Sequence, residues 1–242
     1  MIKFFRNVRK RLLSEGKTSP NDSVGRAGKY FKYAIGEIIL VVIGILIALS
    51  INNWNEEKKL KKEEQKLIAA ITKEIESNIE KLEEALSVNK LCAERSNSII
   101  KEGSSNSNFE TKASDIIGLF CYTGNRIDNS ILNEILGTNS RALISDDKHL
   151  DQLRVLKLNY DRLEKTMNYV DAYWNGTAID FFNSSGVGIY MQQKTINTAE
   201  KFIPDSQFYS VISIMNGFQN SLIRSQEDLD QALKNTFELL NY

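Results

Sequence analysis

Proline, histidine and cysteine are scarce in this chain of 242 residues. The two prolines are Pro20 and Pro204, so residues 21–203 lack the strongest helix breaker, which favours long helices. Two cysteines are too few for a four-cysteine zinc site, and the single histidine, His149, excludes a site built from several histidines. We therefore expect no metal site and no cofactor.

The chain carries no net charge, with 31 basic and 31 acidic residues, but the charges are unevenly placed. Residues 1–32 hold nine Lys or Arg and two acids, and residues 33–51 hold one charged side chain. The remaining chain is mildly acidic. Because 42% of all residues are apolar and 26% are charged, the chain can bury a core and global disorder is excluded.

Residues 33–51 read YAIGEIILVVIGILIALSI and form the one long apolar run. As a helix this run is about 28 Å long, close to the hydrocarbon thickness of a bilayer. A buried helix of a soluble protein and a cleaved signal peptide are the alternatives. The run exceeds the usual apolar region of a signal peptide and no small-x-small cleavage pattern ends it. Aromatic residues flank it, with Tyr30 and Phe31 before it and Trp54 after it. These features predict a transmembrane helix.

Basic residues set the expected orientation of this helix. Nine Lys or Arg precede it, whereas five lysines lie in the first fifteen residues after it. The excess favours a cytoplasmic amino terminus. We therefore predict a basic cytoplasmic tail (1–32), a transmembrane helix (33–51) in a bacterial inner membrane, and a periplasmic domain (52–242).

Two features inside the span are candidates for function. Glu37 is a carboxylate at membrane depth, where such groups are costly. Its use is either structural, by snorkelling to the cytoplasmic headgroups, pairing with Lys29 or Lys32 or staying neutral, or it responds to protons. Gly36, Gly44 and Ala48 are small residues, and the Gly44–Ala48 pair would allow two helices to approach closely. A homo-oligomer is therefore one expected assembly.

The tail has two parts. Residues 1–13 (MIKFFRNVRKRLL) fit a basic amphipathic helix, which beside a membrane span favours the anionic inner leaflet over nucleic acid as the partner. The segment from Gly16 to Gly28 is rich in turn-forming residues and is predicted to be flexible.

The stretch YAIGEIILVVIGILIALSINNWNEEKK, preceded by MIKFFRNVRKRLLSEGK, resembles an uncharacterised family of small membrane proteins. That family is abundant in Bacteroidetes-type bacteria and is known only as a domain of unknown function. The likeness is close over residues 1–60 and looser over 131–137 and 143–147. The long linker between Gly16 and Gly28 departs from the family pattern. The resemblance implies a single-pass inner-membrane protein and carries no activity, ligand or catalytic residue.

After the span, apolar residues recur at helical spacing, which predicts an all-α fold. A helix is expected from about 53 to 102, with a loop at 103–108 and shorter helices at 112–122 and 129–136. Ser145 is expected to cap a helix whose seam continues to Phe181. A break at 183–188, a short helix near 198–202 and a last helix from Asp205 complete the chain. The core positions expected on the first helix are Leu60, Leu67, Ile71, Ile75, Ile79, Leu82 and Leu86, and those on the seam helix are Leu153, Leu156, Tyr160, Leu163, Met167, Val170, Trp174, Ala178 and Phe181. Long helices joined by short loops predict an elongated antiparallel bundle with coiled-coil-like packing.

Catalytic signatures do not stand out. His149 lies beside Asp147 and Asp151, which is typical of a solvated or capping histidine, and no Gly-x-Ser-x-Gly, Glu-x-x-His or phosphate-binding glycine loop occurs. We therefore do not expect an enzyme. Cys92 and Cys121 fall on the first two helices after the span, where they form either a disulfide or two buried thiols.

These observations favour a scaffold or interaction subunit that works with a membrane or envelope protein partner. The aromatic end of the seam is a candidate contact surface, with core packing as the alternative; its residues are Tyr169, Tyr173, Trp174, Phe181 and Phe182. The other candidate functions are a ligand-sensing domain that signals through a partner and an accessory of a proton-driven envelope complex that uses Glu37.

Overall fold

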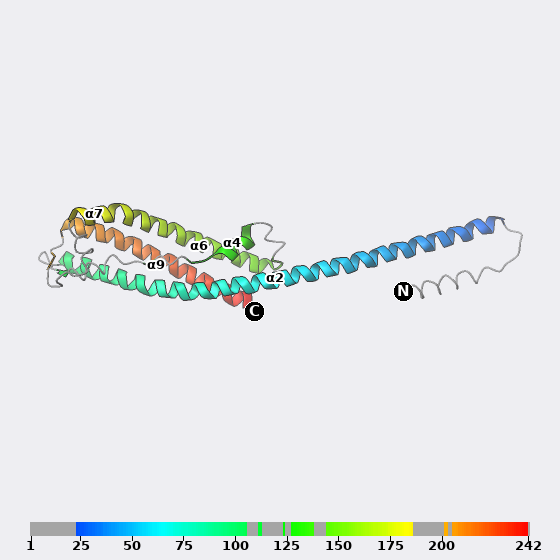
Figure 1. Cartoon of the computed structure of the whole chain (residues 1–242), viewed down its shortest axis with the longest axis horizontal. Coiled ribbons are helices and arrows are strands. Elements are labelled where there is room, and N and C mark those ends of the chain that lie inside the picture. Colours follow the sequence, from blue (N-terminus) through cyan, green and yellow to red (C-terminus); the bar gives the residue numbers. More distant parts are fainter. Residues whose placement is uncertain are drawn as a thin grey trace. The chain divides into compact units, whose positions relative to one another are not determined.

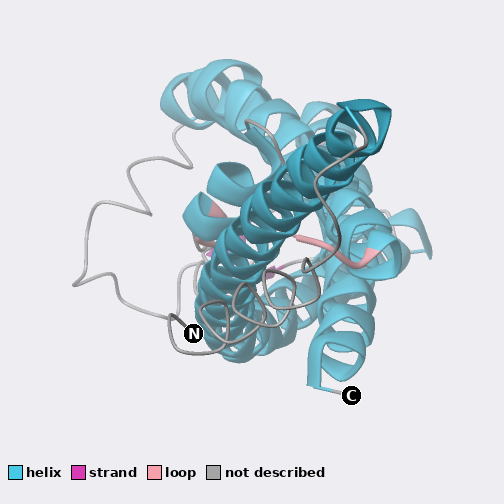
Figure 2. Ribbon diagram, turned by 90° about the vertical axis from the view of Figure 1, so that its right-hand side faces the viewer, coloured by secondary structure: helices cyan, strands magenta, loops and turns pink. Residues whose placement is uncertain are grey.

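The computed structural model describes residues 23–105, 111–112, 123, 127–137, 144–185, 201–202 and 205–241. Helices make up nearly all of this part of the chain (Figures 1 and 2), so the all-α prediction is confirmed. In chain order the elements are α2 (Ser23–Ser105), β1 (Thr111–Lys112), α4 (Ser130–Gly137), α6 (Asp147–Tyr173), the π-helical turn η2 (Trp174–Ala178), α7 (Ile179–Ser185), β2 (Lys201–Phe202) and α9 (Ser206–Asn241).

The chain divides into two units, residues 1–59 and residues 60–242. In the first unit the described residues all belong to α2. This helix begins at Ser23, so the last residues of the predicted flexible linker are helical. The predicted amphipathic helix at residues 1–13 lies outside the described residues.

In the second unit α6 and α9 lie alongside the later part of α2 (Figure 1). Their apolar faces meet in one core, because each helix repeats its apolar residues every three or four positions. The fully buried members of this core include Ile71, Ile75 and Leu82 of α2, Leu153 and Leu156 of α6, and Leu222, Leu229 and Leu233 of α9. Leu60, which the spacing predicted to be in the core, is instead 53% exposed because it precedes the bundle.

The helix α9 runs antiparallel to both of its neighbours. Against α6, Gln152 donates to Thr236 and Arg162 pairs with Asp228, so residue numbers rise along one helix as they fall along the other. Against α2, the same direction follows from the ion pair of Lys90 with Glu227 and that of Lys234 with Glu83.

In contrast, α2 and α6 run parallel. Ser145 bonds Glu64 and Tyr160 bonds Asn78, so residue numbers rise together along the two helices. The expectation that all neighbours are antiparallel is therefore wrong for this pair. The reason is that the described residues before α6 bond progressively earlier positions of α2: Thr123 bonds Asn89, Asp128 bonds Asn78 and Ser145 bonds Glu64.

The start of α6 differs from the prediction. Its N-cap is Asp146, whose carboxylate accepts a bond of 2.7 Å from the main-chain nitrogen of Lys148. Ser145 was the expected cap, but its main-chain nitrogen and hydroxyl bond Glu64, at 2.7 Å and 2.9 Å. The last helix starts as expected, with Asp205 accepting from the nitrogen of Phe208 at 2.7 Å.

Other boundaries also shift. The helix α2 continues through Gly103 to Ser105, where a loop was expected. The residues Thr111 and Lys112 pair with Phe202 and Lys201 as a short antiparallel ladder, where two short helices were expected. The rest of those two predicted helices lies outside the described residues.

Candidate functional site

The apolar segment of α2 is exposed on every side. All twelve of its Ile, Leu and Val side chains between positions 35 and 51 are exposed, from 40% for Leu40 to 62% for Ile38. Within the described residues no other element covers them, and this helix is long and apolar enough to cross a membrane. Each such residue contributes about −0.3 to −0.6 kcal/mol to the free energy of inserting a helix into a membrane, so the twelve together favour insertion by about 4–7 kcal/mol.

The candidate residues inside the segment lie on an open helix surface. A Cβ added at Gly36 or Gly44 would meet nothing within 4 Å among the described atoms, and Ala48 and Glu37 are exposed. The hydroxyl of Ser50 donates to the carbonyl of Leu46 at 2.8 Å, so this polar group is satisfied inside the helix. Among the described residues, the surface therefore leaves room for a second helix.

A polar and aromatic group follows the apolar segment. The ammonium of Lys58 lies 5.4 Å from the ring centroid of Trp54, within the range of a cation–π interaction. One turn away, Asn52 donates to Glu56 at 3.1 Å. Amphipathic side chains of this kind favour the interface between lipid and water.

In the second unit, two buried asparagines of α2 bond the main chain of two described residues that lie between α2 and α4 in the sequence. Asn89 accepts from the main-chain nitrogen of Thr123 at 2.8 Å and donates to its carbonyl at 3.1 Å. Asn78 makes the same pair of bonds with the main chain of Asp128. Both asparagines are completely buried.

Each asparagine is also bonded to another helix. Asn78 donates to the hydroxyl of Tyr160 at 2.7 Å, and Asn89 donates to the side-chain oxygen of Gln226 at 2.9 Å. Burial raises the pKa of Tyr160 well above its usual range. The phenol therefore stays neutral, and the two amides are fixed from both sides.

Glu74 lies one turn before Asn78 and holds the start of α4. Its carboxylate accepts from the main-chain nitrogens of Ile131 and Leu132 at 3.0 Å and 3.4 Å, and from the hydroxyl of Ser130 at 3.3 Å. A negative charge at a helix N-terminus is favourable. Burial nevertheless outweighs these bonds and raises the pKa of Glu74, whereas bonds from Ser130 lower the pKa of the neighbouring Asp128.

A groove of about 840 Å³ opens where α6 starts and α9 ends, and His149 is part of its wall. Ile68, Thr72 and Leu240 supply apolar surface, and Lys73 and Glu76 supply charges of both signs. His149 thus belongs to a mixed polar and apolar surface on the first turn of α6.

The predicted aromatic surface is divided by the fold. Phe181 and Phe182 are buried in a second apolar cluster that also contains Phe208. The ring centroid of Phe181 lies 5.6 Å from that of Phe182 and 6.4 Å from that of Phe208. Tyr173 and Trp174 pack against the same cluster and are half-buried.

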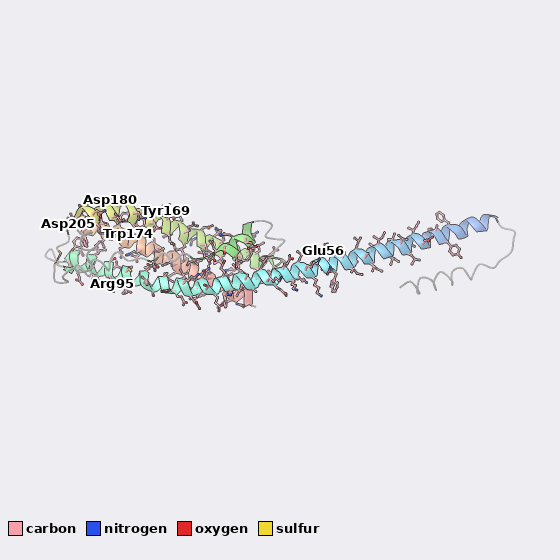
Figure 3. All side chains as sticks on the ribbon, in the orientation of Figure 1. Glu56, Arg95, Tyr169, Trp174, Asp180 and Asp205 are labelled. Carbon is pink, nitrogen blue, oxygen red and sulfur yellow. The ribbon has the colours of Figure 1, made fainter. Side chains whose placement is uncertain are left out.

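Tyr169 is the exposed member of the set, at 55%, and Figure 3 labels it beside Trp174 near the α7 end of α6. Val155 and Leu158, at 47% and 65% exposed, lie on the same face of α6, because the three positions are separated by three and eleven residues. We call Val155, Leu158 and Tyr169 the α6 stripe.

Cys92 is completely buried, one turn after Asn89, and takes part in a disulfide. The sequence has one other cysteine, Cys121, which lies outside the described residues.

Sequence reasoning missed the two asparagines and the π-helical turn, although both left a signal. Asn78 and Asn89 occupy positions of the apolar face of α2, and a polar residue at a core position indicates a specific buried partner. The apolar residues of the seam are separated alternately by three and four positions, except that Val170, Trp174 and Ala178 are separated by four and four. The π-helical turn Trp174–Ala178 lies at this irregularity. Such extra residues are how a π-bulge enters an α-helix.

Comparison with known proteins adds one finding. The model of a family of unknown function, DUF6090, matches residues 37–221, from inside the apolar segment to the middle of α9. No curated protein and no solved structure matches the chain.

Proposed function

We propose that this chain, which belongs to the DUF6090 family of unknown function, is a single-pass inner-membrane protein with a periplasmic helical bundle. In this proposal the bundle acts as a scaffold or interaction subunit for another membrane or envelope protein, and its role is binding rather than catalysis. The observation that carries the anchoring is the apolar segment at residues 33–51, which is exposed on every side of α2.

Two observations support the periplasmic location. Basic residues are more numerous before the apolar segment than after it, which favours a cytoplasmic amino terminus. The disulfide at Cys92 supports an oxidising compartment for the bundle, because disulfides persist in the periplasm and are rare in the cytosol.

The α6 stripe supports the interaction role. Its apolar side chains are exposed on a helix whose opposite face is already buried in the core, so they do not contribute to the fold. Exposed apolar residues that share one face, with a tyrosine among them, are typical of a protein contact.

Substitution on the stripe tests this role. The variant Leu158→Asp should abolish the in-cell cross-link between the bundle and its partner, as identified by mass spectrometry. Because Leu158 is 65% exposed, the variant should melt like the wild type. The matched control is Leu91→Asp, which changes an exposed leucine (47%) on α2 and should keep the cross-link. Equal cross-linking by the wild type and the Leu158 variant would overturn the interaction role of the stripe.

Extraction tests the anchoring. Washing vesicles with alkaline carbonate should leave the wild type in the membrane pellet. The variant Val42→Arg/Leu46→Arg places two charges in the middle of the apolar segment, at about 2.5–3.5 kcal/mol each, and should move to the supernatant. Release of the wild type would contradict the anchoring.

A further inference from the structure

A shallow groove of about 360 Å³ runs along one side of α2 within the first unit. It is lined by Ile43, Leu46, Ile47, Ser50, Ile51 and Trp54. The hydroxyl of Ser50 is bonded to the carbonyl of Leu46, so the groove offers an almost entirely apolar surface.

The groove has the length of one leaflet of a bilayer. Ile43 lies beside the middle of the apolar segment 33–51, and Trp54 lies three positions after the end of that segment. The two residues are eleven positions apart, which is about 16.5 Å along a helix. Half of a hydrocarbon core of about 30 Å is about 15 Å. The groove therefore extends from the middle of the bilayer to the interface between lipid and water.

A cation stands at the interface end of the groove. The ammonium of Lys58 lies 5.4 Å from the ring centroid of Trp54, which is itself 64% exposed. Lys58 also continues the line of the groove, because residues spaced by three or four positions share one face of a helix. The residues of this line are Ile43, Ile47, Ser50, Trp54 and Lys58.

The neighbouring carboxylates leave this cation available to a ligand. Glu56 accepts a hydrogen bond from Asn52 at 3.1 Å. It lies on the side of α2 opposite Trp54, because two positions turn a helix by about 200°. Among the described residues, no carboxylate forms an ion pair with Lys58. The end of the groove is therefore complementary to a negative charge.

The side chains of the groove suit a lipid chain better than a second helix. Close contact between helices in lipid requires small residues, whereas four of the six lining residues are Ile or Leu. The small residues Gly44 and Ala48 each follow an isoleucine of the groove by one position, so they point about 100° away from its line.

We propose that the groove and Lys58 bind one anionic phospholipid of the periplasmic leaflet. An acyl chain lies along the groove between Trp54 and Ile43. The phosphate of a headgroup that has no amine to neutralise it pairs with the ammonium of Lys58. The inference rests on the proposed anchoring in the membrane, and it names the class of lipid that α2 selects.

The test measures which lipid contacts Trp54. The sequence has two tryptophans, so Trp174→Phe leaves Trp54 as the single indole, and Trp174→Tyr replaces this variant should it fail to melt cooperatively. The full chain is reconstituted into bilayers that contain phosphatidylglycerol and phosphatidylcholine in equal amounts. In one preparation the first lipid carries brominated acyl chains, which quench a tryptophan on contact, and in the other preparation the second lipid does. The ratio of the two quenching efficiencies gives the preference for the anionic lipid.

The anionic lipid should be preferred about two- to fivefold, which is the size of the effect expected from one lysine near an anionic surface. Lys58→Gln should remove the preference. The matched control is Lys59→Gln, which makes the same change of charge about 100° around the helix and should keep the preference. Glu57→Gln removes an acid from the same turn and should keep or raise it.

Equal quenching by the two lipids in the protein that retains Lys58 would overturn the proposal. A preference that survives Lys58→Gln, or that Lys59→Gln lowers as much as Lys58→Gln, would also overturn it, because the preference would then belong to the charge of the whole turn.

The same experiment separates the lipid site from the anchoring. If neither lipid quenches Trp54 in a chain that alkaline carbonate leaves in the membrane, a protein helix covers the groove and the lipid site is wrong. If neither lipid quenches Trp54 and carbonate releases the chain, the anchoring itself is wrong. Equal quenching by both lipids leaves the anchoring intact and removes the lipid site alone.

Discussion

The hydrogen-bonded pair of Asn78 and Tyr160 allows a quantitative test of how the bundle is held together. Asn78 is completely buried and Tyr160 is 5% exposed, and the amide donates to the phenol at 2.7 Å. We consider Asn78→Ala, Tyr160→Phe and the double variant. The Asn78 change removes the acceptor of the Asp128 main-chain nitrogen and one of the two donors to its carbonyl, whereas the Tyr160 change removes the hydroxyl that is the second donor.

The two single variants should differ in size. A buried polar group that loses its partner costs about 1–3 kcal/mol. Asn78→Ala leaves the main-chain nitrogen of Asp128 without its acceptor, removes one donor to the carbonyl of Asp128 and leaves a cavity. The free energy of unfolding should therefore fall by about 2–4 kcal/mol. Tyr160→Phe strands one amide proton and should lose about 1–2 kcal/mol.

The double variant should be less unstable than the sum of the two single changes. Once Asn78 is alanine, removing the phenol oxygen no longer strands the amide proton. We therefore expect an interaction energy of about 0.5–1.5 kcal/mol between the two sites. The measurement is unfolding in denaturant at fixed detergent, followed by circular dichroism.

The control is Asn235→Ala, which changes an exposed asparagine of α9 and should stay within about 0.5 kcal/mol of the wild type. A loss below about 0.5 kcal/mol for Asn78→Ala, or strict additivity of the pair, would refute the reasoning. The first result would mean that Asn78 does not hold Asp128, and the second that the bond of 2.7 Å between Asn78 and Tyr160 is not formed.

Three further predictions concern other parts of the bundle. Gly103→Ala should destabilise the protein by about 1–2 kcal/mol, because the added Cβ would lie 1.9 Å from the hydroxyl of Tyr209. At Gly176 an added Cβ would meet nothing within 4 Å, so Gly176→Ala should stabilise the protein by up to about 1 kcal/mol. Thermal unfolding of both variants measures the difference. Burial raises the pKa of Glu74, so its contribution to stability is full below its unfolded pKa and is lost as the pH rises through the folded pKa. Over this pH range the wild type should lose stability relative to Glu74→Gln. A stability difference that does not change with pH would contradict this prediction. The thiol of Cys92 should resist maleimide in denaturant until a reductant is added, and immediate labelling would show that the disulfide is absent.

Much of the fold follows from the spacing of apolar residues. The run of Leu and Tyr residues along α6 was predictable because it forms one continuous apolar face. The start of α9 was predictable because Asp205 is a recognisable cap. The apolar segment of α2 was predictable for a simpler reason, since its composition alone suits lipid.

What the sequence did not predict depends on contacts between distant residues. Ser145 has the right chemistry for a cap, but Glu64, which is 81 positions away, competes for it. The roles of Asn78 and Asn89 depend on a segment that follows them by 34 to 50 positions. Local pattern fixes which face of a helix is buried, and it does not identify the partner of a polar residue on that face.

The same limit applies to the candidate contact surface. Aromatic residues at the end of the seam have the same spacing whether they pack inward or face a partner. Burial separates Phe181 and Phe182 from Tyr169, and it adds Leu158, which sequence reasoning did not select.

The placement of the chain across the membrane is tested most directly by chemical labelling of two single cysteines. In a Cys92→Ser/Cys121→Ser background, Ser14→Cys reports the tail and Ser221→Cys reports an exposed position of α9. With a membrane-impermeant maleimide on intact spheroplasts, we predict labelling at position 221 and protection at position 14 until the membrane is opened. Labelling at position 14 with protection at 221 would reverse the topology, and labelling of both would show that residues 33–51 do not cross the membrane.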